Sequence, residues 1–266
     1  MKVEDDSILP YQQIRLLGRG GQAVVEEVKN TKTGKLYARK AYLLCGSPAA
    51  QHRFENEVAT LKRLSQHPHI VSYVSSYTYQ HRAVIILQPV ASEGSLANFL
   101  NAMHKLPLSV RWGTVDGLWP EILSPAVRCL IRGLATIHNN TTRYKDIKPA
   151  NILVHNGHVP YSDFGIAFDA SDLDSTTTTE ITFDFDRKYC PPEVVHKTRG
   201  KRNRKSDIFA LGCVFAEIFS ALNPDTLPRE MLTTCFAENY ETVVGQLYEQ
   251  IEQATKTDNE KNRFLH

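Results

Sequence analysis

Residues 144–154 of the chain read YKDIKPANILV, and the tripeptide DFG follows, beginning at Asp163. The first segment carries Asp146, Lys148 and Asn151, so the two segments together supply two carboxylates, an amine and an amide. Few reactions need such a set, and transfer of a phosphoryl group from a magnesium-bound nucleotide is the foremost of them. Asp146 can orient the acceptor hydroxyl, and Lys148 can hold the moving phosphoryl group. Asn151 and Asp163 can hold the metal ion.

These two segments resemble the H-R-D-x-x-x-x-N and D-F-G elements that mark protein kinases. The chain as a whole resembles a eukaryotic-type protein kinase, and Lys148 matches the serine/threonine form of the loop. The resemblance implies phosphorylation of serine or threonine hydroxyls on protein substrates, with ATP and Mg²⁺ as cofactors. It also implies that Asp146 and Lys148 are catalytic and that Asn151 and Asp163 are the metal ligands.

Two residues of the first segment depart from the family's pattern. Tyr144 stands where the family has histidine, and we expect its ring to pack against Phe164. Lys145 keeps the positive charge of the usual arginine but lacks the bidentate guanidinium fork. We therefore expect a phosphate on the later loop at residues 175–179 to be held less firmly than in the family.

A glycine-rich run, GRGGQAVV at residues 18–25, lies between two predicted strands. Glycines there let backbone N–H groups approach phosphates with no Cβ in the way. Taken alone, such a run is at least as often an ordinary hairpin. The resemblance implies that Leu17, Gly18, Gly20 and Val25 contact the nucleotide.

Lys40 lies on the following predicted strand, in the sequence YARK, which resembles V-A-I-K of the family. An isolated lysine on a strand is usually a solvated surface group. Here Glu57, on the next predicted helix, offers the carboxylate that would hold Lys40 against the nucleotide phosphates. Glu55 lies two residues earlier and should point to roughly the opposite face of that helix. The resemblance also assigns Ala38 to the nucleotide site.

A dinucleotide-binding fold is the rival use of closely spaced glycines. That fold needs a helix that opens at the glycines and an acidic residue about 20 positions later. This chain continues as a predicted strand and supplies Lys40 in that region instead. We reject the rival.

Residues 85–90, IILQPV, resemble the hinge between the two lobes of the family. The resemblance implies that Leu87 is the gatekeeper and that the backbone of Gln88 and Val90 bonds the adenine edge. It also places Leu153 among the nucleotide-binding residues. Without the flanking motifs, a buried strand running into a loop would fit this segment equally well.

The alternative function is that of a pseudokinase, which binds nucleotide or partner proteins without transferring phosphate. Ala23 in place of the third glycine, Lys145 and Asp186 favour this alternative. Asp186 falls where serine/threonine kinases usually have a threonine, and its carboxylate would compete for Lys148. Retention of the lysines, carboxylates and amide described above favours the enzyme.

We expect an α+β protein with the two-lobed protein-kinase fold, spanning residues 11–266. The small antiparallel-sheet lobe would cover about residues 11–88 and the larger helical lobe about residues 91–266. Turn and β-branched signals predict strands within residues 11–44, 69–78 and 83–87, and apolar spacing predicts helices at 51–65, 127–137 and 208–221. The motifs cover about residues 11–221, so we expect the C-terminal end of the large lobe to be shortened.

The composition is that of an ordinary globular protein, with 42% hydrophobic and 23% charged residues. A formal net charge of +2 gives no general attraction to nucleic acid or acidic membranes, so we expect neither as a partner. The five cysteines include no C-x-x-C pair, which predicts reduced thiols in an intracellular compartment. The acidic N-terminus is no secretory signal, and the longest apolar runs are too short to span a bilayer. We expect a monomer in the cytoplasm or nucleus.

Overall fold

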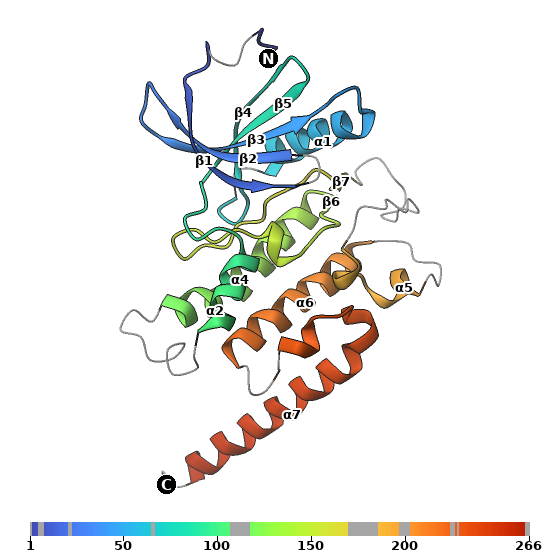
Figure 1. Ribbon diagram of the computed structural model, residues 1–266. Helices are drawn as coiled ribbons and strands as arrows, with labels where there is room; N and C mark the ends of the chain where they lie inside the picture. The colour runs from blue at the N-terminus through green and yellow to red at the C-terminus, as the bar shows by residue number, and fades with distance from the viewer. Residues whose placement is uncertain are drawn as a thin grey trace. The chain divides into compact units, whose positions relative to one another are not determined.

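The computed structural model of the protein divides into two compact units. The first comprises Met1–Phe99 and Glu121–Thr176, and the second comprises Leu100–Pro120 and Thr177–His266. Within these limits the structure describes residues 2–4, 8–20, 23–64, 67–106, 118–169, 186–196, 203–223, 227 and 229–263. The first unit contains the sheets, and the second is helical wherever it has regular structure (Figure 1).

A five-stranded antiparallel sheet dominates the first unit. Its strands run in the order β1 (Tyr11–Arg19), β2 (Ala23–Asn30), β3 (Leu36–Leu43), β5 (Arg82–Gln88) and β4 (Ser72–Tyr79). The turn between β2 and β3 forms because the Asn30 side chain accepts hydrogen bonds from the backbone N–H groups of Lys32 and Thr33, each at 3.0 Å. Gly34 completes the turn with a φ of 73°, which a residue with a Cβ adopts only at a cost.

The register of the sheet places several predicted nucleotide-site residues in one row. Val25 lies opposite both Gly18 on β1 and Lys40 on β3, and Lys40 lies opposite Ile85 on β5. Directly opposed residues of antiparallel strands point to the same face, so this row shares one face of the sheet. Ala38 joins that face because it is two residues from Lys40.

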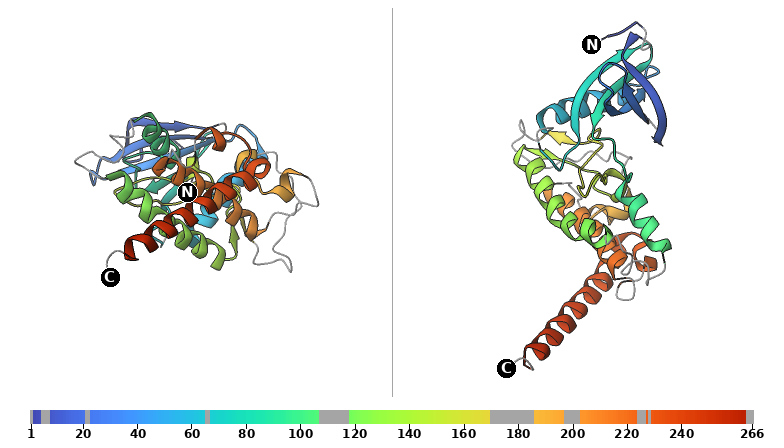
Figure 2. Two further views of the ribbon diagram at one scale, coloured as in Figure 1. Left: turned by 90° about the horizontal axis from the view of Figure 1, so that it is seen from below. Right: turned by 90° about the vertical axis from the view of Figure 1, so that its left-hand side faces the viewer.

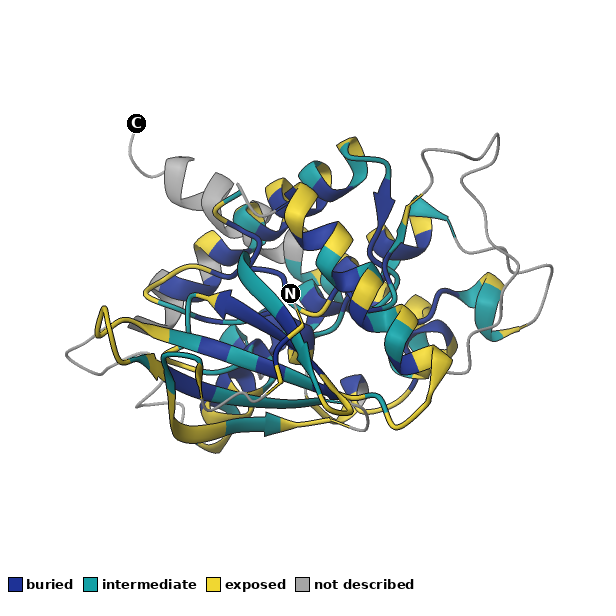
Figure 3. Cartoon of the chain, turned by 90° about the horizontal axis from the view of Figure 1, so that it is seen from above, coloured by how far each residue is buried: buried dark blue, intermediate teal, exposed yellow. Residues whose placement is uncertain are grey.

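Helix α1 (Pro48–Leu64) covers the face that carries Lys40 (Figure 1). Its buried side chains include Phe54, Glu57, Leu61 and Leu64, whose spacing of three and four residues forms one helical stripe. The opposite face of the sheet has its own apolar cluster, formed by Val3, Tyr77, Val84 and Ile86. β5 is therefore buried at every position except its two ends, whereas β1 is largely exposed (Figure 3).

Helix α4 (Leu118–Asn139) begins earlier than the sequence predicted. Apolar spacing predicted this helix only from residue 127, but the structure carries it through Pro120 and Pro125. Pro120 costs little because first-turn N–H groups have no partner within the helix. Pro125 does remove a helical hydrogen bond, and the burial of Ile122, Leu123 and Ala126 around it offsets that loss.

The remaining elements up to residue 169 are helix α2 and three short segments. They are α2 (Leu96–Lys105), β6 (Thr142–Arg143), the 3₁₀ turn η2 (Pro149–Asn151) and β7 (Phe168–Asp169), with β6 and β7 paired antiparallel. β6 and η2 flank the segment that carries Asp146, and β7 follows the DFG tripeptide.

In the second unit, helix α6 (Arg204–Leu222) starts four residues before the predicted position of 208. Its first turn is polar, so apolar spacing did not reveal it. Asn203 caps this turn, because its side chain accepts from the N–H of Lys205 at 2.7 Å while its own N–H donates to the Ser206 hydroxyl at 3.3 Å. The cap sequence was the signal that would have placed the start correctly.

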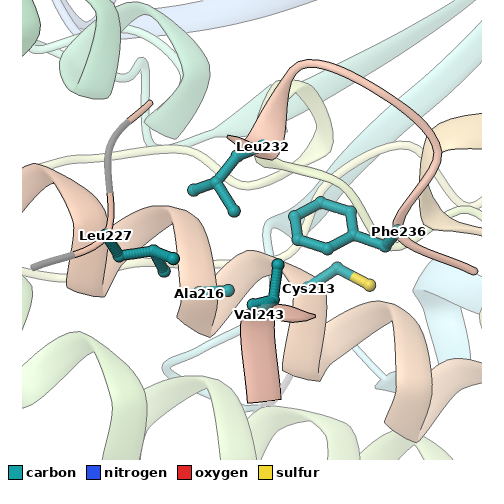
Figure 4. Close-up of a cluster of buried hydrophobic side chains, with 6 residues drawn as sticks. All are labelled: Cys213, Ala216, Leu227, Leu232, Phe236 and Val243. Carbon is teal, nitrogen blue, oxygen red and sulfur yellow. The ribbon is translucent and has the colours of Figure 1, made fainter. Parts of the chain in front are cut away.

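The second unit also contains helix α7 (Phe236–Arg263), which runs as one continuous helix (Figure 2), and the short turns η3 (Arg187–Tyr189), α5 (Pro192–Val195) and η4 (Arg229–Leu232). Its core joins α6 to the start of α7 (Figure 4). The buried side chains of this core are Cys213, Ala216, Leu227, Leu232, Phe236 and Val243. In the close-up, the ring of Phe236 faces Leu232 and lies over Cys213.

The antiparallel sheet and the helical unit confirm the predicted α+β fold. The predicted limits of the domain and of its two lobes stay predictions. Within the described residues, no helix has both the length and the apolar character needed to cross a membrane.

We predict that Phe236→Ala lowers the free energy of unfolding by about 3–5 kcal/mol, because it empties the centre of the second unit's core. Tyr248→Ala on α7 is the control, since that side chain is 66% exposed. Its effect should stay within about 0.5 kcal/mol. Urea denaturation followed by circular dichroism measures both, and equal effects of the two changes would contradict the prediction.

Candidate active site

The ammonium group of Lys40 is held by a carboxylate from α1. Its Nζ atom donates to Glu57 Oε1 at 3.0 Å and to Oε2 at 2.8 Å. The pair is removed from water, with Lys40 6% exposed and Glu57 fully buried. Glu55 is exposed on the same helix and accepts from Gln51 instead. α1 therefore presents Glu57, and not Glu55, to the sheet.

A second carboxylate reaches the same lysine from the DFG tripeptide. Asp163 Oδ1 lies 2.9 Å from Lys40 Nζ, and the side chain of Asp163 is 48% exposed. Asp163 has a φ of 59°, in the left-handed region that non-glycine residues seldom occupy. The Gly165 N–H donates to the same Oδ1 atom at 3.4 Å. Lys40 thus joins β3, α1 and the DFG tripeptide at one point.

Tyr42 is a member of this group that the sequence did not reveal. Its hydroxyl donates a hydrogen bond to Glu57 Oε2, and its ring centroid lies 5.1 Å from Lys40 Nζ. The residue is buried and packs edge-on against Phe54. The available signal was its position two residues after Lys40 on a strand, which places both side chains on one face.

The surroundings of this group set the charges of its members. Burial alone would lower the pKa of Lys40, but the carboxylates of Asp163 and Glu57 outweigh it and raise the pKa well above the usual value. Burial raises the pKa of Glu57, and the charge of Lys40 opposes that rise. Burial also acts to raise the pKa of Asp163, but Lys40 outweighs it, so this pKa lies below its usual value. Lys40 is therefore firmly cationic.

Asp146, Lys148 and Asn151 form a second group. Lys148 Nζ lies 3.0 Å from Asp146 Oδ2, and Asn151 Nδ2 donates to that same oxygen at 2.7 Å and to the Asp146 carbonyl at 3.0 Å. The 3₁₀ turn η2 brings Asn151 back over Asp146. Burial raises the pKa of Asp146, while the charge and hydrogen bond of Lys148 oppose the rise. A carboxylate with a raised pKa suits proton transfer near neutral pH.

Tyr144 connects the second group to the DFG tripeptide. Its ring meets Phe164 edge-on with centroids 5.0 Å apart, which confirms the predicted packing. Its hydroxyl donates to the carbonyl of Ser162, and the Ser162 N–H in turn donates to the carbonyl of Asn151 at 2.9 Å. Lys145, with a φ of 70°, places its Nζ 5.6 Å from the ring of Phe168.

The polar atoms of the two groups fit a magnesium-bound nucleotide. Carboxylate and amide oxygens are the ligands that Mg²⁺ prefers, and Asp163 and Asn151 offer one of each. Asn151 Nδ2 donates its hydrogen bonds to Asp146. The other polar atom of this side chain is Oδ1, and an amide oxygen is the atom that binds a metal ion. Lys40 supplies a fixed positive charge for phosphate oxygens.

The other predicted nucleotide-site residues lie on the surrounding strands or in the segments that follow them. Leu17, Gly18 and Val25 are half-buried on β1 and β2, and the Gly20 N–H donates to the Ala23 carbonyl at 2.9 Å. Ala38 is buried opposite Leu87. Gln88 ends β5, Val90 follows it, and the Leu153 N–H donates to the Pro160 carbonyl. Within the described part of the chain, Gln88, Val90 and Leu153 form no hydrogen bond or ion pair with either group.

In the second unit, Asp186 has a local partner. Its side chain accepts from the Lys188 N–H at 3.1 Å and caps the 3₁₀ turn η3. The loop at residues 175–179, where phosphorylation was considered, lies outside the described residues.

Comparison with known proteins agrees with this geometry. A sequence model described as the protein kinase domain matches residues 11–264. The chain belongs to the protein kinase domain family. The match extends past Ala221, so the resemblance is not limited to about residues 11–221 as the motifs alone indicated. Kinase domains of this family use ATP and Mg²⁺ in general.

Named relatives of this kinase domain share between a quarter and a third of its residues. Mitogen-activated protein kinase kinase 2 of Arabidopsis thaliana is 28% identical over 92% of this chain and 64% of its own length. Serine/threonine-protein kinase cds1 of Schizosaccharomyces pombe is 31% identical over 80% of this chain and 45% of its own length. Mitogen-activated protein kinase kinase kinase ANP1 of Arabidopsis thaliana is 29% identical over 81% of this chain and 31% of its own length. The kinase domain thus spans less than two thirds of these relatives.

We predict that Tyr42→Phe lowers the free energy of unfolding of the kinase domain by about 1.5–3 kcal/mol, because a buried carboxylate loses a hydrogen bond. Tyr73→Phe is the matched control, since it removes a hydroxyl that bonds neutral Ser76 at 2.8 Å. That change should cost only about 0.5–1.5 kcal/mol. Urea denaturation at neutral pH compares the two, and a smaller effect for Tyr42 than for Tyr73 would contradict the prediction.

Proposed function

We propose that this kinase domain transfers the terminal phosphoryl group of ATP to serine or threonine hydroxyls of protein substrates. The observation that carries the proposal is the pairing of two groups in one compact unit. Lys40 bonds two carboxylates from different elements, and Asp146 bonds both Lys148 and Asn151 nearby. The two groups influence each other electrostatically: burial acts to raise the pKa of Asp163, Lys40 lowers it, and the charge of Lys148 adds to that lowering.

The first group binds and orients the nucleotide in this proposal. ATP supplies the phosphoryl group when bound, and Mg²⁺ neutralises charge on the phosphate oxygens. Lys40 holds the phosphates, and Glu57 keeps the lysine side chain extended toward them. Asn151 and Asp163 would hold the metal. The backbone and apolar side chains that surround the nucleotide would come from Leu17, Gly18, Gly20, Val25, Ala38, Gln88, Val90 and Leu153.

The second group prepares the acceptor. Asp146 accepts a hydrogen bond from the substrate hydroxyl and orients its oxygen, and its raised pKa allows it to receive the proton at the carboxylate. Lys148 lies 3.0 Å from that carboxylate and offers a positive charge for the transferred group. Positioning and charge stabilisation supply most of the catalysis in such a reaction, because phosphoryl transfer needs little covalent help from the protein.

The relatives support an enzyme that acts on proteins. Their printed names describe serine/threonine-protein kinases and kinases of mitogen-activated protein kinase cascades. Those names give no support to the pseudokinase alternative, and this chain keeps every polar residue of both groups. The chain covers only part of each relative's length, so action on a protein substrate is part of this proposal. A monomeric state, the absence of nucleic-acid partners and a cytoplasmic or nuclear location stay predictions.

The proposed roles predict a shift in the pH dependence of kcat/KM. Lys148 lowers the pKa of Asp146, so Lys148→Met should raise that pKa and move the acid limb upward by about one pH unit. Activity needs the ionised carboxylate of Asp146, so activity falls as the pH is lowered. In Lys148→Met this fall should begin at a higher pH than in the wild-type protein. Lys148→Arg keeps the charge and is the control. An acid limb at the same pH in all three proteins would contradict the prediction.

Transfer of radiolabelled phosphate from ATP, with Mg²⁺ or Mn²⁺, tests the function itself. We expect transfer to the protein itself or to a generic protein acceptor, and we expect Asp163→Ala to abolish it. Glu93→Ala removes an exposed carboxylate outside both groups and should leave transfer intact. If a folded, ATP-binding sample transfers no phosphate with either metal, the proposed function is wrong.

A further inference from the structure

Asn56, the residue before Glu57 on α1, bonds the backbone that follows Asp163. Its Nδ2 atom donates to three carbonyl oxygens, those of Phe164 at 3.2 Å, Gly165 at 3.1 Å and Ala167 at 2.7 Å. Asn56 is itself half-buried. One side-chain amide on α1 therefore bonds three backbone carbonyls of the turn at residues 164–167.

The turn at residues 164–167 depends on such a donor. The Ala167 N–H donates back to the Phe164 carbonyl at 3.0 Å, which folds the segment tightly and turns its carbonyl oxygens toward α1. The Phe164 and Ala167 residues are buried, so water cannot readily replace a missing protein donor. The turn also lies beside the Lys40 group, since an added Cβ at Gly165 would be in van der Waals contact, at 3.4 Å, with both the Tyr42 hydroxyl and Asp163 Oδ1.

Asn56 and Glu57 together close a ring of contacts around Lys40. Glu57 holds the lysine from α1. Asn56 holds the turn at residues 164–167, and Asp163 at the start of that turn holds the same lysine at 2.9 Å. Because the two residues are adjacent on a rigid helix, movement of α1 away from the sheet would disturb both carboxylates at once.

We propose that Asn56 is a positioning residue of the kinase domain, which fixes Asp163 relative to the Lys40–Glu57 pair by holding the backbone of residues 164–167. This inference deepens the proposed function and rests on it. Asn56 touches neither nucleotide nor acceptor in this role. It acts through Asp163, because it holds the backbone from which the Asp163 side chain reaches Lys40.

A purely structural role for Asn56 makes a different prediction. Under that role, loss of the amide would lower stability, and each molecule that remains folded would still turn over normally. Under the positioning role, folded molecules would bind the acceptor normally and transfer phosphate slowly. Asn56→Asp separates the two, because it keeps the size of the side chain but faces three carbonyl oxygens with a carboxylate that has nothing to donate.

Asn140→Asp is the matched control. Asn140 lies in the first unit just after α4, is half-buried, and donates from Nδ2 to one backbone carbonyl, that of Thr136, at 2.9 Å. It takes no part in either group of the site. Both variants therefore lose an amide-to-carbonyl hydrogen bond and gain a negative charge, but only Asn56→Asp breaks the link to the DFG tripeptide.

The experiment measures kcat and the KM for a generic protein acceptor, per folded molecule, together with thermal unfolding. We expect kcat to fall at least about tenfold in Asn56→Asp, equivalent to about 1.4 kcal/mol of activation free energy, with the acceptor KM unchanged. Asn140→Asp should keep the wild-type kcat. Equal kcat values for the two variants, beside an active wild-type protein, would overturn the inference.

Hydrogen exchange keeps the test independent of activity. If the wild-type protein shows no transfer, the proposed function fails, and the link made by Asn56 is judged by amide exchange instead. Faster exchange in both α1 and residues 163–169 of Asn56→Asp, but not of Asn140→Asp, supports the inference. Unchanged exchange in these segments overturns it.

Discussion

The buried charge of Lys40 is the constraint on which the first unit depends. An ammonium group that is only 6% exposed carries a large desolvation cost unless carboxylates surround it. β3 does not supply them, because the neighbouring residues that share the lysine's face on this strand are Ala38 and Tyr42. The carboxylates come from α1 and from the DFG tripeptide, so both elements must approach the same strand. The packing of α1 and the turn after Asp163 each place a carboxylate beside this buried ammonium group.

A buried ion pair is weak evidence for stability, since its desolvation cost often equals the attraction that it gains. The arrangement around Lys40 is better understood as a means of fixing positions. Tyr42 supports this interpretation, because its hydroxyl gives the buried Glu57 Oε2 atom a second hydrogen bond beside that of Lys40. Asn56 does the same for the backbone beyond Asp163. In both cases the donor and the acceptor belong to different elements, so the hydrogen bond also fixes how those elements meet.

The sequence revealed the charged members of the site and the amide of Asn151, and it missed Tyr42 and Asn56. Lys40 and Glu57 were predictable because the YARK segment resembles V-A-I-K of the family and the next predicted helix offers Glu57, while helical geometry turns Glu55 to roughly the opposite face. Tyr42 escaped because an aromatic residue on a strand ordinarily belongs to the core. Asn56 escaped because bonds from a side chain to distant backbone carbonyls leave no pattern in the sequence. The early starts of α4 and α6 were missed for a local reason, since prolines and polar first turns mask apolar spacing.

The two carboxylates on Lys40 differ in a way that separates their tasks. Glu57 is fully buried, and burial raises its pKa while the charge of Lys40 opposes that rise, so the two must stay together. Asp163 is about half exposed with a lowered pKa, so it stays ionised and retains access to solvent. Neighbouring titratable groups whose environments push their pKa values apart commonly take different roles. In the proposed function, Lys40 keeps Glu57 as a permanent partner and can exchange Asp163 for a phosphate oxygen, which leaves the Asp163 carboxylate available to a metal ion.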